Sequence, residues 1–143
     1  MKSGSTMEWL VSYADTDAGG VVYHGRYIEQ AERSRHRLLL DIDLPFLSLE
    51  KENDCLFVVR AMNASYVQPA FLGQRLTVTS GIKQLREAYS VWDTTIANDT
   101  GCICIITAKL VCLSAKERVL RTMPDDVFQA LLPMTREGGC EVH

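Results

Sequence analysis

The sequence lacks the features of several protein classes. It has no uninterrupted apolar run of about 18 residues, so no membrane-spanning helix is expected. It has no basic excess, because 15 Lys and Arg stand against 18 Asp and Glu for a net charge of −3, which disfavours nucleic-acid binding. Internal repeats, low-complexity tracts and Pro- or Gly-rich linkers are also absent. We therefore expect a single domain over residues 1–143, with its core at about 8–130.

Cysteine is present but follows no metal-binding pattern. The five cysteines are Cys55, Cys102, Cys104, Cys112 and Cys140. A zinc site normally needs two close Cys/His pairs, so neither a metal nor another cofactor is expected. Unpatterned cysteines in odd number are typical of reduced thiols, and residues 1–7 have no apolar core of a secretory signal, so a cytoplasmic location is expected. Serine-hydrolase elbows, Walker loops and dinucleotide fingerprints are missing too.

One segment carries a strong helical pattern. At 100° per residue, Tyr27, Ala31 and Leu38 fall on one stripe, whereas Arg26 and Arg33 lie outside it. The pattern predicts an amphipathic helix over about 25–40. Four Arg against two Glu give this segment a local net charge of +2, which would attract the phosphates of a ligand or simply face solvent.

The remaining pattern is mostly that of strands. Strands are expected over 8–13, 56–67 with a bulge, 75–85, 89–97 and 102–113, with a hairpin turn at 98–101 and a short second helix at 45–52. Short connections favour an antiparallel sheet, so the fold class is α+β, with one long helix covering the sheet. The strand at 102–113 is apolar on both faces near its start, which favours a homo-oligomer.

Alternation within two strands predicts which side chains share a face. Trp9, Val11 and Tyr13 are expected on one face of the first strand. Cys102, Cys104 and Cys112 are expected together as small core residues of the last strand.

The segment DTDAGGVVYHGRY, residues 15–27, joins the first strand to the long helix and carries the chemistry. The first N–H groups of a helix lack internal partners and lie at its positive end. A carboxylate held outside that end can act as base or nucleophile on a carbonyl whose oxygen those N–H groups hold, and His24 can assist it. Turn and cap chemistry alone would also explain Asp15 or Thr16, and a divalent cation would need further acidic ligands that are not close in sequence.

Two stretches of the chain together form a recognisable pattern. The first reads Tyr13, Asp15-Thr16-Asp17, Ala18-Gly19-Gly20, Val21-Val22, Tyr23-His24, Tyr27, Glu32 and Arg35; the second reads Phe57-Val58-Val59-Arg60, Tyr66 and Pro69-Ala70. The chain therefore resembles the 4-hydroxybenzoyl-CoA thioesterase family of the hotdog fold, especially its bacterial acyl-CoA thioesterases associated with the Tol–Pal system. Relatives commonly have an acidic residue where Gln74 stands here.

The resemblance implies a fold, a reaction and a set of site residues. It implies a hotdog fold, in which a curved antiparallel sheet wraps one long helix, and a homodimer or homotetramer with active sites at the dimer interface. It implies hydrolysis of an acyl-CoA, with Asp17 as nucleophile or general base and His24 assisting. The substrate-binding residues expected on this basis are Gly20, Tyr23, Gly25, Val59 and Arg60.

Other readings stay open from the sequence. A non-catalytic hotdog module that binds acyl-CoA or an acyl-carrier protein is the main alternative, and a hotdog dehydratase or hydratase is a third. Glu32 and Arg35 are expected to form a partly buried i, i+3 ion pair, although a place for Glu32 near the thioester is the sharper reading. Arg60 would reach a phosphate or pair on its strand.

Overall fold

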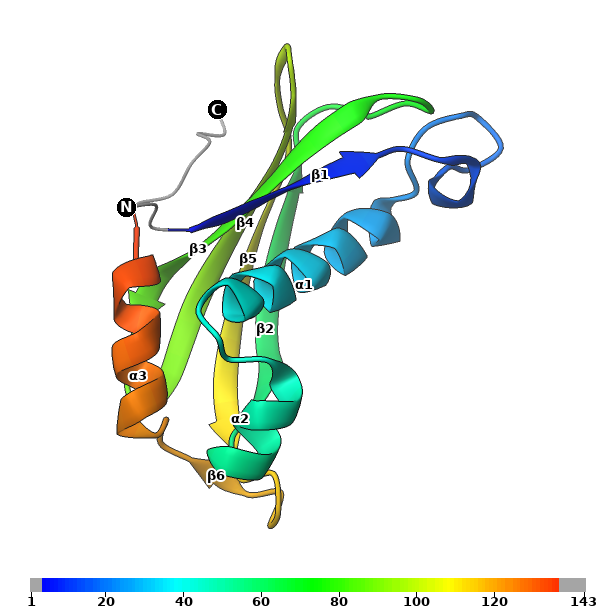
Figure 1. Ribbon diagram of the computed structural model, residues 1–143. Coiled ribbons are helices and arrows are strands. Elements are labelled where there is room, and N and C mark those ends of the chain that lie inside the picture. Colours follow the sequence, from blue (N-terminus) through cyan, green and yellow to red (C-terminus); the bar gives the residue numbers. More distant parts are fainter. Residues whose placement is uncertain (1–3, 137–143) are drawn as a thin grey trace.

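The computed structural model describes residues 4–136, which form one antiparallel sheet with three α-helices packed on one face (Figure 1). The strands are β1 (Ser5–Leu10), β2 (Leu56–Tyr66), β3 (Arg75–Leu85), β4 (Tyr89–Asn98), β5 (Gly101–Leu113) and β6 (Leu120–Arg121). The helices are α1 (His24–Asp41), α2 (Phe46–Glu52) and α3 (Asp125–Leu131). The strand order is β1-β3-β4-β5-β2, with β6 paired to β5. The α+β class, the antiparallel sheet and the short second helix expected at 45–52 are confirmed, but three helices cover the sheet where the long helix alone was expected to do so.

Helix α1 forms where the sequence predicts it, and each of its ends extends one residue beyond the predicted range of about 25–40. Its apolar stripe is buried against the sheet, and Ala31 and Leu38 are fully covered. Burying a leucine side chain of this kind stabilises the fold by about 1.5–3 kcal/mol. The same stripe also buries the charged side chain of Arg35, which is 6% exposed.

The predicted first strand is wrong at its end. Strand β1 starts at Ser5 and stops at Leu10, and a short 3-10 turn follows over Tyr13–Asp15. Trp9 and Val11 are buried as expected, but Tyr13 is 82% exposed. The reason is that the turn redirects the chain before Tyr13, so alternation no longer decides which face this residue occupies.

The cysteine prediction for β5 is right at two positions and wrong at one. Cys104 and Cys112 are buried, whereas Cys102 is only partly covered. A register shift between Ile96 and Ala97 of β4 opposite this part of β5 breaks the alternation that would have placed Cys102 with the other two. Cys55, Cys104 and Cys112 are free thiols, and Cys140 lies outside the described residues.

Two elements near the end of the described chain escape the sequence patterns used above. Strand β6 has two residues and pairs with the end of β5. Helix α3 begins after Pro124 with two acidic residues in its first turn, and it buries Val127 and Leu131 against the sheet. Proline followed by acidic residues is a helix-start signal, so α3 could have been found from its sequence. No helix within residues 4–136 is long and apolar enough to cross a membrane.

Strand β2 lies at one edge of the sheet and leaves apolar side chains exposed. It follows β5 at the end of the strand order, and no described strand pairs with its other side. Val58, Val59, Met62 and Tyr66 are each more than a third exposed along it. The bulge predicted in this strand is confirmed, because the register shifts between Val59 and Ala61. An edge of this kind can pair with another chain.

Candidate active site

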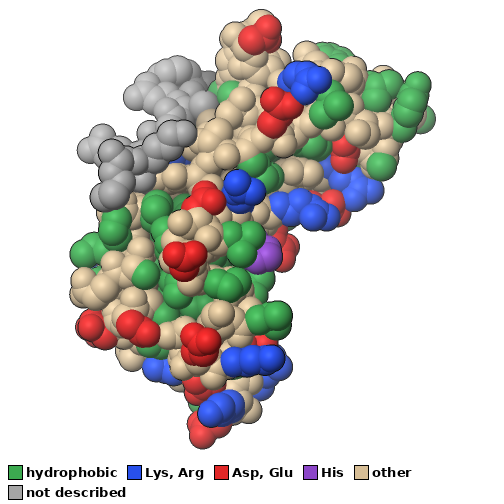
Figure 2. All heavy atoms as spheres, viewed as in Figure 1, with side chains coloured by type: hydrophobic (Ala, Val, Ile, Leu, Met, Phe, Trp, Pro, Cys, Tyr) green, Lys and Arg blue, Asp and Glu red, His purple; other side chains and the backbone are tan. Residues whose placement is uncertain are grey.

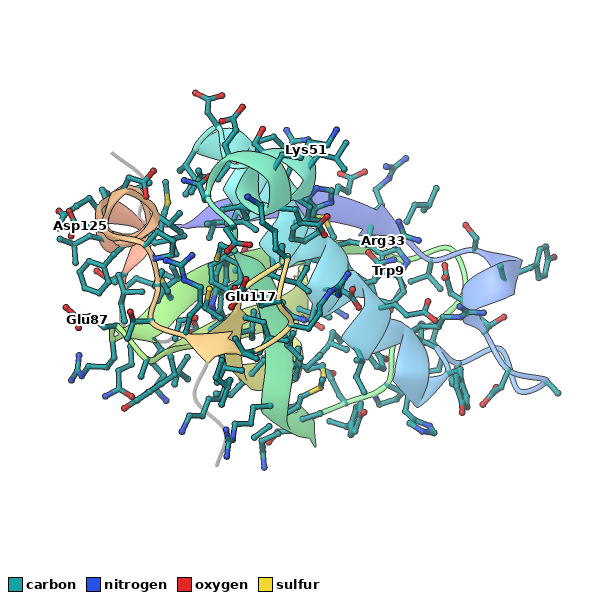
Figure 3. All side chains as sticks on the ribbon, turned by 90° about the horizontal axis from the view of Figure 1, so that it is seen from below. Trp9, Arg33, Lys51, Glu87, Glu117 and Asp125 are labelled. Carbon is teal, nitrogen blue, oxygen red and sulfur yellow. The ribbon has the colours of Figure 1, made fainter. Side chains whose placement is uncertain are left out.

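Asp15 fixes the loop that joins β1 to α1. Its Oδ2 accepts hydrogen bonds from Trp9 Nε1 at 3.1 Å and from the Ser12 N–H at 2.8 Å. Its backbone oxygen accepts the Tyr23 N–H at 2.9 Å, immediately before α1 begins. Trp9, labelled in Figure 3, stacks edge-on against an aromatic ring of α1. Asp15 therefore has the turn role that the sequence predicts, and it ties the loop to both neighbouring elements.

Asp17 is presented to solvent on this loop. Its Oδ1 accepts the Gly19 N–H at 2.9 Å, and its other carboxylate oxygen accepts no hydrogen bond from the described residues. The loop closes through the Asp17 N–H to the Val21 carbonyl at 2.9 Å and the Gly20 N–H to the Asp17 carbonyl at 3.1 Å. Gly20 has φ of +79°, which glycine adopts without strain. The second carboxylate oxygen of Asp17 therefore faces solvent without a hydrogen bond from the described residues.

The start of α1 offers backbone N–H groups without a cap. Tyr23 occupies the N-cap position, and no side chain caps the helix. The N–H groups of His24 and Gly25 donate to no acceptor within the described chain. A Cβ at Gly25 would lie 2.9 Å from the Tyr23 ring, so glycine lets that ring lie against the first turn. These N–H groups lie at the positive end of the helix, where an oxyanion is stabilised.

Tyr66, at the end of β2, brings the exposed sheet edge to the start of α1. Its hydroxyl donates to the His24 carbonyl at 3.5 Å, and the rings of His24 and Tyr66 are 6.3 Å apart. The His24 side chain is exposed and lies 4.4 Å from the Tyr23 ring. Within residues 4–136, no hydrogen bond or ion pair joins Asp17 to His24. One copy of the chain therefore presents these two groups separately.

Val59 and Arg60 do not share a pocket. Val59 lines a cavity of about 320 Å³ between α1 and β2, whereas Arg60 lines an open pocket of about 490 Å³ formed by β2, β4, β5 and the β6 region. In that second pocket Arg60 is joined by Lys109 and Arg121. Neither pocket is lined by Asp17. The resemblance implied a substrate-binding part for both Val59 and Arg60, but Arg60 lies at the bulge where the register of β2 shifts, and there the strand turns it toward the other pocket.

The ion pair expected between Glu32 and Arg35 is not formed. No nitrogen of Arg35 lies within 4.0 Å of a Glu32 oxygen, although the two groups interact electrostatically at longer range. Arg35 is buried and Glu32 is exposed, although both line the same cavity between α1 and β2. Arg side chains lie along the outward side of α1 with acidic side chains among them (Figure 2).

Gln74, which stands where relatives commonly have an acidic residue, closes a turn. Its side-chain oxygen accepts the Phe71 N–H at 3.0 Å, and its carbonyl accepts the Val11 N–H at 2.9 Å. The preceding segment supports the loop directly, because the Ala70 carbonyl accepts the Val22 N–H at 2.9 Å. In this chain Gln74 therefore holds the scaffold of the loop.

An exposed carboxylate and an uncapped helix start, joined by one fixed loop, are the groups that attack on a carbonyl requires. A family model described as the thioesterase-like superfamily matches residues 11–131, most of the chain and both of these features. The chain belongs to the thioesterase-like superfamily. Its fold is accordingly the hotdog fold of these thioesterases.

Named relatives of this thioesterase-like chain include bacterial enzymes. It is 36% identical over 85 residues to the acyl-CoA thioesterase YbgC of Helicobacter pylori, covering 59% of this chain and 61% of that protein. This match therefore spans less than two thirds of the relative's length. The acyl-CoA thioesterase YbgC of Haemophilus influenzae is 28% identical over 130 residues, which cover 91% of this chain and 96% of that protein.

Solved structures show the same superfamily fold. A probable thioesterase from Bartonella henselae aligns with a TM-score of 0.79 and 28% identity, covering 85% of this chain and 99% of that one. The hypothetical protein TT1821 from Thermus thermophilus aligns with a TM-score of 0.84, covering 94% and 99%. Its identity is 22%, so this second likeness concerns the fold alone.

Two residues of the open pocket lined by Arg60 were not predicted from the sequence. Lys109 and Arg121 join Arg60 in the open pocket, although they are 12 residues apart in the chain. Lys109 lies over the Tyr89 ring at 4.3 Å, which fixes its ammonium group. Lys109 is a lone charge in an apolar strand, a signal for an outward-facing position, but only the sheet register brings it beside Arg60.

Proposed function

We propose that this protein hydrolyses the thioester of an acyl-CoA, giving the free acid and coenzyme A. The observation that carries the proposal is the Asp17 carboxylate, held by one hydrogen bond from Gly19 on the loop that leads into the uncapped start of α1. Two relatives named acyl-CoA thioesterases support it, one of them matched over nearly its whole length.

The proposed chemistry divides between the carboxylate and the helix start. The thioester carbonyl oxygen would accept hydrogen bonds from the N–H groups of His24 and Gly25, which stabilise the negative charge that develops there. As a general base, Asp17 takes a proton from water while the hydroxide adds to the carbonyl carbon; as a nucleophile, it adds itself and water then hydrolyses the anhydride. In both routes the C–S bond breaks and the coenzyme A thiolate takes up a proton.

Gly20, Tyr23 and His24 have supporting parts in this proposal. The strain-free backbone of Gly20 allows the loop to present Asp17, and the Tyr23 ring covers one side of the helix start. His24 would donate a hydrogen bond to the substrate or orient the carboxylate. If it acts as an acid or base, His24→Ala lowers turnover by roughly 10²- to 10⁴-fold.

The site is proposed to be completed by a second copy in a homodimer or homotetramer. The free β2 edge and its exposed apolar side chains support pairing between two sheets. Tyr66 lies at the end of this edge and contacts the backbone of His24, so a paired copy would lie next to the helix start. Sedimentation of the whole chain measures this directly, and a monomer at micromolar concentration would contradict it.

The open pocket lined by Arg60 is proposed to receive phosphate groups of coenzyme A. Arg60, Lys109 and Arg121 line it and no acidic residue does, although Arg121 also forms an ion pair with Asp54 at 3.9 Å. Guanidinium and ammonium groups are suited to phosphate oxygens. We place the reaction in the cytoplasm on the basis of the free thiols of Cys55, Cys104 and Cys112. The more specific affiliations, to 4-hydroxybenzoyl-CoA thioesterases and to the Tol–Pal system, stay predictions.

Release of free coenzyme A, followed by chromatography, tests the proposal. Wild type and Asp17→Asn are compared on straight-chain and aromatic acyl-CoAs and on an acyl-carrier-protein thioester. Release by the wild type that Asp17→Asn abolishes supports the hydrolase. Binding without release, from a folded oligomer, would instead favour the non-catalytic module, and addition of water to an enoyl-CoA would favour a hydratase.

A further inference from the structure

The buried face of α1 contains one unpartnered positive charge. Arg35 is 6% exposed, and it forms no hydrogen bond and no ion pair within 4.0 Å among residues 4–136. Burial lowers the pKa of this guanidinium, and the more distant Glu32 partly offsets the effect. The Arg35 nitrogens are not among the fully buried polar atoms without a partner, so the guanidinium reaches solvent through the cavity that it lines. A largely buried charge is costly for a folded protein, and a ligand that pairs with it there would offset the cost.

Arg35 lines the cavity of about 320 Å³ between α1 and β2. The rest of the lining is apolar apart from Glu32, with Val59 and Phe57 on the strand side and Trp92 and Leu110 from the middle of the sheet. Trp92 and Leu110 are buried, so the cavity reaches the core. Its volume is at the lower end of the range for small-molecule sites. The cavity therefore suits a short hydrocarbon chain that ends in a group able to pair with Arg35.

The guanidinium chemistry specifies that end group. Arginine is a donor only, and its planar fork matches the two oxygens of a carboxylate. Glu32 does not satisfy it, because its side chain is exposed and stands beyond ion-pair distance. We propose that this cavity takes the acyl chain of the substrate and that Arg35 binds a carboxylate at its far end. The protein then prefers carboxyacyl-CoA to alkyl acyl-CoA. The inference rests on the proposed thioesterase function and names its substrate class.

The helix sets the range of chain lengths to test. Arg35 lies eleven residues beyond His24 in α1, about 16 Å along the helix axis. Long helical side chains point back toward the N-terminus, which shortens the span that the acyl chain must cover. The series of dicarboxylic acid monothioesters therefore runs from short chains to chains longer than eight carbons, each compared with the alkyl acyl-CoA of equal carbon number, and only members long enough to cover the remaining span are expected to be preferred.

The experiment measures kcat/KM for each matched pair and the equilibrium binding of each acyl-CoA. In the wild type, the carboxyacyl member of at least one pair is preferred by about 10- to 100-fold, the range expected for a charged hydrogen bond in a buried site. Arg35→Met removes this preference, and Arg35→Lys restores part of it. Arg33→Met is the matched control, because Arg33 lies on the exposed face of α1 (labelled in Figure 3), and it keeps the preference.

The outcomes separate this inference from the proposed function. Hydrolysis of alkyl acyl-CoA with no carboxyacyl preference in the wild type would leave the thioesterase standing and overturn the inference, even if Arg35→Met does not fold. If no thioester is hydrolysed, the proposed function fails, and binding of the matched pairs to wild type still decides the role of Arg35. If Arg35→Met lowers kcat/KM equally for both members of each pair and dissociates to monomers, Arg35 belongs to the contact between copies. That result would also overturn the inference.

Discussion

Replacing Asp15 with alanine should destabilise the fold, whereas the same change two residues later at Asp17 should not. The Asp15 carboxylate accepts hydrogen bonds from the Ser12 N–H at 2.8 Å and from Trp9 Nε1 at 3.1 Å. Trp9 is 5% exposed, so its indole N–H would be left without an acceptor in a largely buried place. Asp17 is exposed and accepts one hydrogen bond, from the Gly19 N–H of its own turn.

The size of the effect follows from these contacts. Loss of a hydrogen bond to a charged group costs about 1.5–3 kcal/mol, and an exposed neutral donor regains water at little cost. We therefore expect Asp15→Ala to lower the free energy of unfolding by about 2–3 kcal/mol, because the buried Trp9 donor dominates. For a chain of this size, that corresponds to a fall in Tm of roughly 5–10 °C. Asp17→Ala should cost less than about 1 kcal/mol.

Urea unfolding followed by far-ultraviolet circular dichroism measures both variants against wild type. Circular dichroism is preferred to tryptophan fluorescence, since the change lies beside Trp9. The protein concentration is held fixed, because the stability of an oligomer depends on it. An Asp15→Ala variant within about 0.5 kcal/mol of wild type would refute the role of Asp15 as the anchor of the loop.

Three further predictions concern the helix start and buried or hydrogen-bonded ionisable groups. Gly25→Ala should lower turnover while the fold remains, since the new Cβ would meet the Tyr23 ring at 2.9 Å; unchanged kinetics would show that this ring does not matter. Burial raises the pKa of Cys104 to about 12, so at pH 8 we expect mass spectrometry to detect its alkylation only after unfolding; rapid labelling of the native protein would contradict this. The Lys116 N–H and then the Ser114 hydroxyl lower the pKa of Asp54, so its carboxylate stabilises the folded state at neutral pH, and this stabilisation is lost as the pH falls through the lowered value. Asp54→Asn should therefore be less stable than wild type at pH 7, with the difference closing in acid; a gap that does not change with pH would disprove it.

Local sequence patterns predicted those parts of the fold that depend on local chemistry. The stripe of α1 was found because Ala31 and Leu38 repeat at helical spacing, and β3 was found because buried residues alternate from Leu76 to Ile82, before the register shift between Ile82 and Gln84. The end of β1 was missed, because it depends on the hydrogen bond between the side chains of Trp9 and Asp15. Tertiary contacts of this kind leave no periodic signal.

In the candidate site, too, features formed by contiguous residues could be predicted and features formed by distant residues could not. The loop that carries Asp17 could be predicted, because its turn residues and the helix start are contiguous in sequence. The cavity lined by Arg35 could not, because it is assembled from α1, α2 and three strands that are far apart in the chain. Sequence spacing suggested Glu32, the neighbour one helical turn away, whereas in the structure the two side chains line the same cavity without forming an ion pair.

The dependence of coenzyme A release on Asp17 tests the central claim most directly. Wild type, Asp17→Asn and Asp99→Asn are compared on the best substrate of the panel, with Asp99→Asn as a control for removal of one exposed carboxylate. The account predicts that Asp17→Asn loses nearly all turnover while it keeps the fold and ligand binding, and that Asp99→Asn behaves as wild type. Full activity of a folded Asp17→Asn variant would contradict it.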